Sequence, residues 1–251
     1  MAKSIAVAGK GGIGKSTLSA LLVKALQHIG EVPILAVDAD ADSNLATLLG
    51  IENGESVGEL REDVLREVQN FPAGMSKAAY VEAGLHQIIV ESEGFDLITM
   101  GRGEGAGCYC YLNTLIRKFS EDLAPSYKWI IFDNEAGLEH LSRRTTENVD
   151  ALLVVVGENP LSLHSAKSIK EIVDQMGNRI RNIYAVMNMV KPRNIEKIEG
   201  SLSDLGLEVL CRLPYDETLE QMVFDNSRIV STKGLAIWND VLSIIESVRR
   251  M

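Results

Sequence analysis

The sequence has no apolar run that approaches the roughly 20 residues a membrane-spanning helix requires. It has only three cysteines, which in a chain of this composition do not indicate a disulfide framework. Its 25 lysines and arginines are outnumbered by 35 aspartates and glutamates, which gives a formal net charge of −10. Because non-specific nucleic-acid binding depends on cations that neutralise phosphates, this charge argues against a nucleic-acid partner. The first predicted strand also starts too near Met1 to leave room for a signal peptide. We therefore expect a cytoplasmic protein without nucleic-acid or membrane partners.

The pattern of apolar runs predicts the fold. Short apolar runs alternate with amphipathic stretches of helix length, and strands that alternate with helices pair in parallel. Near-continuous apolar strands indicate a sheet that is covered on both faces. We therefore expect an α/β fold with a doubly wound, mostly parallel sheet and helices on both faces, built as a single domain over residues 1–251. The predicted strands are 4–8, 33–37, 95–100, 129–132, 151–156, 182–187 and 208–213.

Three further helices are predicted outside this regular alternation. A helical insert at about 52–93 contains one helix at 59–68, opened by a capping box from Ser56 to Glu59, and another at 77–91. The amphipathic stretch 235–249 carries too few cations for a strong membrane anchor. We expect it to pack on the protein's own sheet.

Residues 9–17 read Gly-Lys-Gly-Gly-Ile-Gly-Lys-Ser-Thr, between a predicted strand and a helical pattern. This is a P-loop, in which glycines turn backbone N–H groups toward a phosphate chain and the following helix adds its positive dipole end. Lys15 is expected to reach the β- and γ-phosphates, and Ser16 to ligate Mg²⁺. The predicted nucleotide-binding residues are Gly11, Gly12, Ile13, Gly14, Lys15, Ser16 and Thr17.

Three carboxylates follow the second predicted strand, at the edge of the sheet where ligands bind in such folds. Asp38 is expected close to Mg²⁺, and Asp40 to take part in the chemistry. For Asp42 and Ser43 we predict a structural role, as caps of the helix that starts near Leu45.

The strand at 129–132 ends at Asp133, and an apolar strand followed by aspartate is a Walker B pattern. Asp133 is expected to accept a hydrogen bond from a magnesium-bound water, and the N–H of Gly137 to sense the γ-phosphate. His140 could be a general base, a metal ligand or a residue that braces this loop, and the sequence does not choose among these.

Base recognition is expected at the ends of the last strands, through Asn188 and the segment that begins at Pro214. The asparagine amide offers a donor and an acceptor, which match N6 and N7 of adenine. The residues after Met187 lack the aspartate of a guanine-reading Asn-Lys-x-Asp motif, so ATP is favoured over GTP.

A glycine-rich loop at 101–107 leads to Cys108 and Cys110. Two thiols so close cannot complete a tetrahedral or square-planar shell, so a metal bound there needs two more donors. A two-fold dimer presents the same loop twice and would supply four thiolates, which can hold nickel or zinc. Cys211, inside an apolar strand, is expected to be a buried structural residue.

The P-loop contains an additional lysine, Lys10, near its start. With this lysine, the segment resembles the deviant Walker A motif of the MinD/ParA-like ATPases. The resemblance implies a homodimer closed by ATP, in which Lys10 reaches the nucleotide of the partner subunit. It also implies that Asp40 orients the attacking water. The expected catalytic residues are therefore Lys10, Lys15 and Asp40.

The segments Gly-Arg-Gly-Glu-Gly-Ala-Gly-Cys-Tyr-Cys, Glu-Ala-Gly-Leu-Glu-His and Leu-Pro-Tyr-Asp-Glu are similar to those of CooC-type nickel-insertion ATPases. This resemblance covers essentially the whole chain. It implies an ATPase that uses ATP and Mg²⁺ and inserts Ni²⁺ into a client enzyme, either carbon monoxide dehydrogenase or acetyl-CoA synthase. The nitrogenase iron protein is a less suitable relative, because residues 133–140 lack the cysteine that its bridging cluster needs.

Two alternatives remain at this point. The chain could be a MinD/ParA-like positioning or partner-recruiting ATPase without metal cargo, or a small-molecule kinase or synthetase on the same fold. The sequence does not identify the client, the native metal, the coupling of hydrolysis to metal release or the role of the insert.

Overall fold

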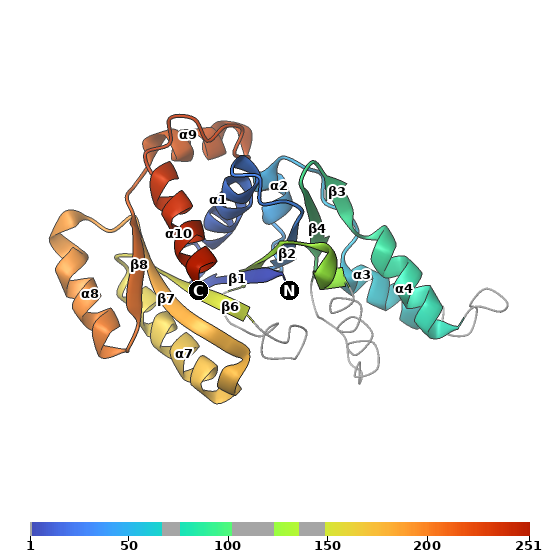
Figure 1. Cartoon of the computed structure of the whole chain (residues 1–251), viewed down its shortest axis with the longest axis horizontal. Helices are drawn as coiled ribbons and strands as arrows, with labels where there is room; N and C mark the ends of the chain where they lie inside the picture. Colours follow the sequence, from blue (N-terminus) through green and yellow to red (C-terminus); the bar gives the residue numbers. More distant parts are fainter. Residues whose placement is uncertain (1, 67–75, 102–122, 136–148) are drawn as a thin grey trace.

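The centre of the molecule is a sheet whose strands run mostly parallel (Figure 1). The structure, a computed structural model, describes residues 2–66, 76–101, 123–135 and 149–251. Within these ranges eight strands follow the order β3-β4-β2-β5-β1-β6-β7-β8, and β3 is antiparallel to β4. The predicted doubly wound α/β fold is confirmed.

All seven predicted strands are present, and their ends agree with the prediction to within two residues. Their bounds are β1 Lys3–Gly9, β2 Ile34–Ala39, β3 Val90–Ser92, β4 Phe95–Thr99, β5 Trp129–Asn134, β6 Val149–Val156, β7 Ile180–Asn188 and β8 Glu208–Leu213. The described helices are α1 Lys15–His28, α2 Leu45–Leu49, α3 Val57–Arg66, α4 Lys77–Gln87, α7 Pro160–Met176, α8 Ile195–Asp204, α9 Glu217–Asn226 and α10 Trp238–Arg250.

The sheet separates two hydrophobic cores. In β1, Ile5 and Val7 belong to the core that contains α1, α2 and α10. Ala6 and Ala8 belong to the opposite core, beneath α3, α4, α7 and α8. All four side chains are fully buried, because a central parallel strand is covered on both faces.

The C-terminal helix α10 packs on the protein's own core, as predicted. It contacts α1 and β8, and its buried stripe is Val241, Ile244, Ile245 and Val248. Among the described residues, none of the helices combines the length and the apolar character needed to cross a membrane.

The helices between β2 and β4 differ from the prediction at their ends. The capping box is confirmed, since the N–H of Ser56 donates to Glu59 Oε2 at 2.7 Å and the N–H of Glu59 to Ser56 Oγ at 3.2 Å. The helix it opens, α3, starts at Val57 and so begins two residues earlier than expected.

The helix predicted at 77–91 is too long. It ends at Gln87, and the following residues form the edge strand β3, which the sequence did not reveal. Val90 pairs with Leu97 across a hairpin whose turn contains Gly94 at φ +81°. A three-residue strand has too short a pattern to be recognised, and its pairing with β4 decides its conformation.

We predict that Ser56→Ala lowers the free energy of unfolding by about 1 kcal/mol, because the first turn of α3 loses its side-chain acceptor. Urea denaturation would measure this change. The matched control is Ser165→Ala, whose exposed hydroxyl bonds only to a carbonyl within α7 and should cost much less. Equal effects of the two substitutions would contradict the importance of the cap.

Candidate functional site

The ends of β1, β2 and β5 bring the predicted site residues to one edge of the sheet. β5 lies between β1 and β2, and its register pairs Asp133 with both Val7 and Asp38. The P-loop continues directly from β1 into α1 at the same edge. Parallel topology therefore places the loop and both aspartates together, as the sequence predicts.

Two glycines of the P-loop have a positive φ and a close neighbour where a side chain would begin, so any other residue would be strained there. A Cβ on Gly9, at φ +150°, would lie 2.6 Å from the carbonyl oxygen of Val155. A Cβ on Gly14, at φ +91°, would lie 2.6 Å from Nδ2 of Asn188. No acidic residue lies in the first turn of α1. The positive end of α1 is thus available to an anion.

Lys15, the lysine of the P-loop, is almost buried at 5% exposure and forms an ion pair with Asp40. Its Nζ lies 3.9 Å from Asp40 Oδ2, and that carboxylate is 16% exposed. The other oxygen of Asp40 accepts the N–H of Asp42 at 3.1 Å. Two residues assigned separate catalytic roles from the sequence therefore contact each other in the structure.

Asp133 is fully buried beside the P-loop. Its Oδ1 lies 3.0 Å from the hydroxyl of Ser19, whereas Oδ2 has no hydrogen-bond partner among the residues the structure describes. Burial raises the pKa of this carboxyl to about 6, and the hydroxyls of Ser16 and Ser19 and the charge of Lys15 act in the opposite direction. No sequence motif marks Ser19. It lies four residues after Lys15, and this spacing places both side chains on one face of α1.

Asp38 has a structural role that the sequence did not predict. Its fully buried carboxylate accepts the N–H groups of Asp40 at 3.1 Å and of Leu45 at 3.0 Å. The expectation that Asp42 or Ser43 caps α2 is therefore wrong: the N-cap position is Asn44, which makes no side-chain cap bond. A carboxylate on the preceding strand supplies the acceptor instead. Burial raises the pKa of Asp38 to about 7, and the neighbouring Asp133 and Asp40 add to the shift.

The next residue after Asp133, Asn134, carries a buried amide. Asn134 is 1% exposed, and its Nδ2 donates to the carbonyl of Val7 at 3.1 Å. Its Oδ1, like Oδ2 of Asp133, has no hydrogen-bond partner among the residues described. The edge of the sheet thus holds two buried oxygens without a donor from the described residues, which is costly unless another group supplies one.

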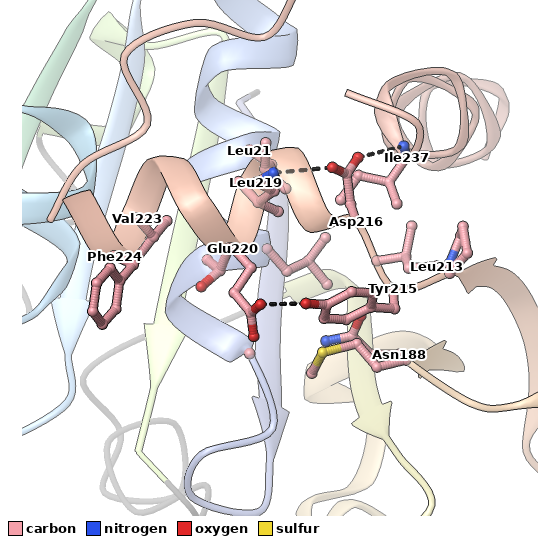
Figure 2. A pocket seen from close by; sticks show the side chains of 15 residues that line it. Leu21, Asn188, Leu213, Tyr215, Asp216, Leu219, Glu220, Val223, Phe224 and Ile237 are labelled. Carbon is pink, nitrogen blue, oxygen red and sulfur yellow. Dashed lines mark hydrogen bonds between the residues drawn. The ribbon is translucent and has the colours of Figure 1, made fainter. Parts of the chain in front are cut away.

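The two residues predicted to contact the base line a cavity of about 340 Å³ beside the P-loop (Figure 2). The cavity lies between α1 and α9, and Asn188 and Pro214 form part of its wall with Gly14 and Thr17. Nδ2 of Asn188 donates to the carbonyl of Ile13 at 2.9 Å, so this amide also holds the P-loop in place.

Of the remaining predicted site residues, only some lie in the described part of the chain. Lys10 is partly exposed and forms no ion pair with any residue in the described ranges. Gly137, His140, Cys108 and Cys110 lie outside those ranges. Elsewhere in the described part of the chain, no group of three or more His, Cys, Asp or Glu side chains is placed to hold a metal ion. Cys211 is a buried free cysteine, as expected.

The profile of the CobQ/CobB/MinD/ParA nucleotide binding domain matches residues 4–229. The chain belongs to this family. It is 41% identical to an uncharacterized ATP-binding protein of Methanocaldococcus jannaschii, over 94% of this chain and 90% of that protein. It is 30% identical to the carbon monoxide dehydrogenase accessory protein CooC of Rhodospirillum rubrum, over 86% and 85% of the two chains. MinD in the MinC:MinD cell division protein complex of Aquifex aeolicus shares the fold, with a TM-score of 0.72 and 20% identity over 100% and 96% of the two chains.

We predict that Asp133→Asn stabilises the nucleotide-free protein at pH 8. A carboxyl whose pKa is raised to about 6 by folding destabilises the native state increasingly as pH rises from about 4 to 6. Removing this charge should raise the free energy of unfolding by up to about 3 kcal/mol at pH 8 and by much less at pH 4.

Denaturation at several pH values would measure this gain, with the exposed Asp204→Asn as the control. A gain that did not shrink toward low pH would show that the charge of Asp133 is not its cause.

Proposed function

We propose that this protein is an ATP-dependent metallochaperone that inserts nickel into the active-site cluster of a carbon monoxide dehydrogenase or acetyl-CoA synthase. The observation that carries the proposal is the similarity to CooC across most of both chains, in a sequence that also contains the pair Cys108 and Cys110. Nickel is the cargo in this proposal. It is held by thiolates from two copies of the chain, and zinc would bind the same four thiolates.

ATP hydrolysis is the proposed energy source, and the Lys15–Asp40 ion pair suggests how binding is coupled to it. Lys15 can contact the β- and γ-phosphates only if its charge is shared with, or released from, Asp40. An arriving phosphate chain competes for the same ammonium. Asp40 is thereby freed to accept a proton from the water that attacks the γ-phosphate, giving ADP and phosphate.

A Mg²⁺ ion fits the oxygen atoms at this site. Ser16 and Asp133 offer a hydroxyl and a carboxylate, and Oδ2 of Asp133 is buried without a hydrogen-bond partner among the described residues. Mg²⁺ prefers oxygen ligands together with water and substrate phosphates. When bound, the ion would neutralise charge on the phosphates, and Asp133 would hold it through a water molecule.

Lys10 is proposed to act across a homodimer. It is partly exposed and makes no ion pair with the residues described, so its charge is available to the nucleotide of the partner subunit. Gly137, which lies beyond the described residues, is proposed to sense the γ-phosphate. Hydrolysis would then change the geometry of the metal site.

We expect Lys10→Ala to lower the ATPase rate on the order of a thousandfold, as loss of a trans-acting cation does in related phosphoryl transfer, while ATP still binds. Lys15→Ala should abolish both binding and turnover. Steady-state phosphate release and equilibrium ATP binding would separate the two effects. A Lys10→Ala protein with the wild-type rate would contradict action across the dimer.

We expect reduced, anaerobic protein to bind one Ni²⁺ or Zn²⁺ per dimer, and the double substitution Cys108→Ala/Cys110→Ala to lose it. Cys211→Ala is the matched control and should retain the metal, because that thiol is buried in β8. Metal stoichiometry and the oligomer mass with and without ATP are the measurements.

ATP-dependent dimerisation without cysteine-dependent metal would overturn the metallochaperone proposal. It would favour a positioning ATPase of the MinD/ParA type, the alternative that the fold also accommodates.

A further inference from the structure

Phe224 is the most exposed large hydrophobic side chain in the described part of the protein. It lies on α9 and is 83% exposed, although the helix is well formed and begins at the side-chain cap of Asp216. Burial of a phenylalanine side chain is worth about 1.5–3 kcal/mol, and the isolated chain does not gain this stabilisation at Phe224. The side chain is therefore available to a ligand.

The position of Phe224 shows which ligand it can meet. It lines the cavity of about 340 Å³ that also contacts Gly14 and Thr17 of the P-loop. This volume lies within the range of small-molecule sites. A nucleotide whose phosphates occupy the P-loop would extend its nucleoside into this cavity.

The wall of the cavity is mostly aliphatic. Leu18 and Leu21 come from α1, Leu219 and Val223 from α9, and Ile237 from the segment before α10. A planar base can pack against such side chains, and an aromatic ring at the rim adds a stacking surface.

Most of the polar side chains around the cavity already have partners within the protein. Asp216 accepts the N–H groups of Leu219 at 2.9 Å and of Ile237 at 3.2 Å, and Tyr215 donates its hydroxyl to Glu220 (Figure 2). Asn188 donates to the P-loop carbonyl of Ile13. These bonds hold the polar side chains in place, and the rest of the wall offers a base apolar contact and a stacking surface.

We infer that Phe224 binds the nucleobase: its ring stacks on the base of a nucleotide whose phosphates are held by the P-loop. This inference rests on the proposed use of ATP and adds a residue that no sequence motif marks. Stacking is tolerant of base identity, because every base has a π-face. Phe224 therefore contributes affinity for ATP and GTP alike, and selection between them depends on other groups.

The test compares binding of ATP and of inorganic tripolyphosphate, which has the phosphates without a nucleoside. Phe224→Ala should raise the Kd for ATP about tenfold, within the range found for base–aromatic stacking, and leave the Kd for tripolyphosphate unchanged. Phe224→Tyr keeps an aromatic ring and should restore ATP affinity. The control is Leu161→Ala, which removes another exposed apolar side chain, on α7 and away from the cavity.

A fluorescence measurement gives a second readout. In Phe224→Trp, ATP should quench the added indole and tripolyphosphate should not, relative to the background from Trp129 and Trp238.

Wild-type ATP affinity in Phe224→Ala, or an equal loss for ATP and tripolyphosphate, would overturn the inference and leave the proposed ATPase intact. Failure of the wild-type protein to bind either ligand would instead overturn the proposed function, and the inference with it.

Discussion

The balance of buried charge at the carboxyl edge of the sheet is the constraint on which the site depends. Asp38 and Asp133 are adjacent in register and fully buried, and the charge of Lys15 acts on Asp133. Burial disfavours both carboxylates and raises their pKa values to about 7 and 6. Backbone N–H groups offset this cost for Asp38, whereas one oxygen of Asp133 receives no hydrogen bond from the residues that the structure describes. A cation and a phosphate chain would complete this arrangement.

The same helix links this charged edge to the apolar cavity. The first two turns of α1 place Lys15 and Ser19 at the carboxylates, and Leu18 and Leu21 from the same turns lie in the cavity wall. Asn188 connects the two parts, since it lines the cavity and bonds to the P-loop. Displacement of the P-loop would therefore alter the nucleoside cavity as well as the Lys15–Asp40 contact.

Residues close together in sequence were predicted best. The P-loop and Asp133, near the end of β5, lie where the motifs placed them, because a strand–loop–helix segment fixes its own geometry. The edge strand β3 was missed, since its three residues depend on pairing with β4. The cap of α2 was assigned to Asp42 or Ser43, but the acceptor is Asp38, seven residues from the N–H it binds.

By itself, the sequence determined the fold class and the position of the P-loop between β1 and α1, because apolar periodicity and the glycine loop are local signals. Only the tertiary structure decided that Lys15 pairs with Asp40, that Ser19 bonds Asp133 and that Phe224 borders the cavity. Each of these contacts joins elements distant along the chain, so its geometry depends on how the helices pack on the sheet. Burial, which sets the pKa values of the aspartates, is likewise a property of the packed molecule.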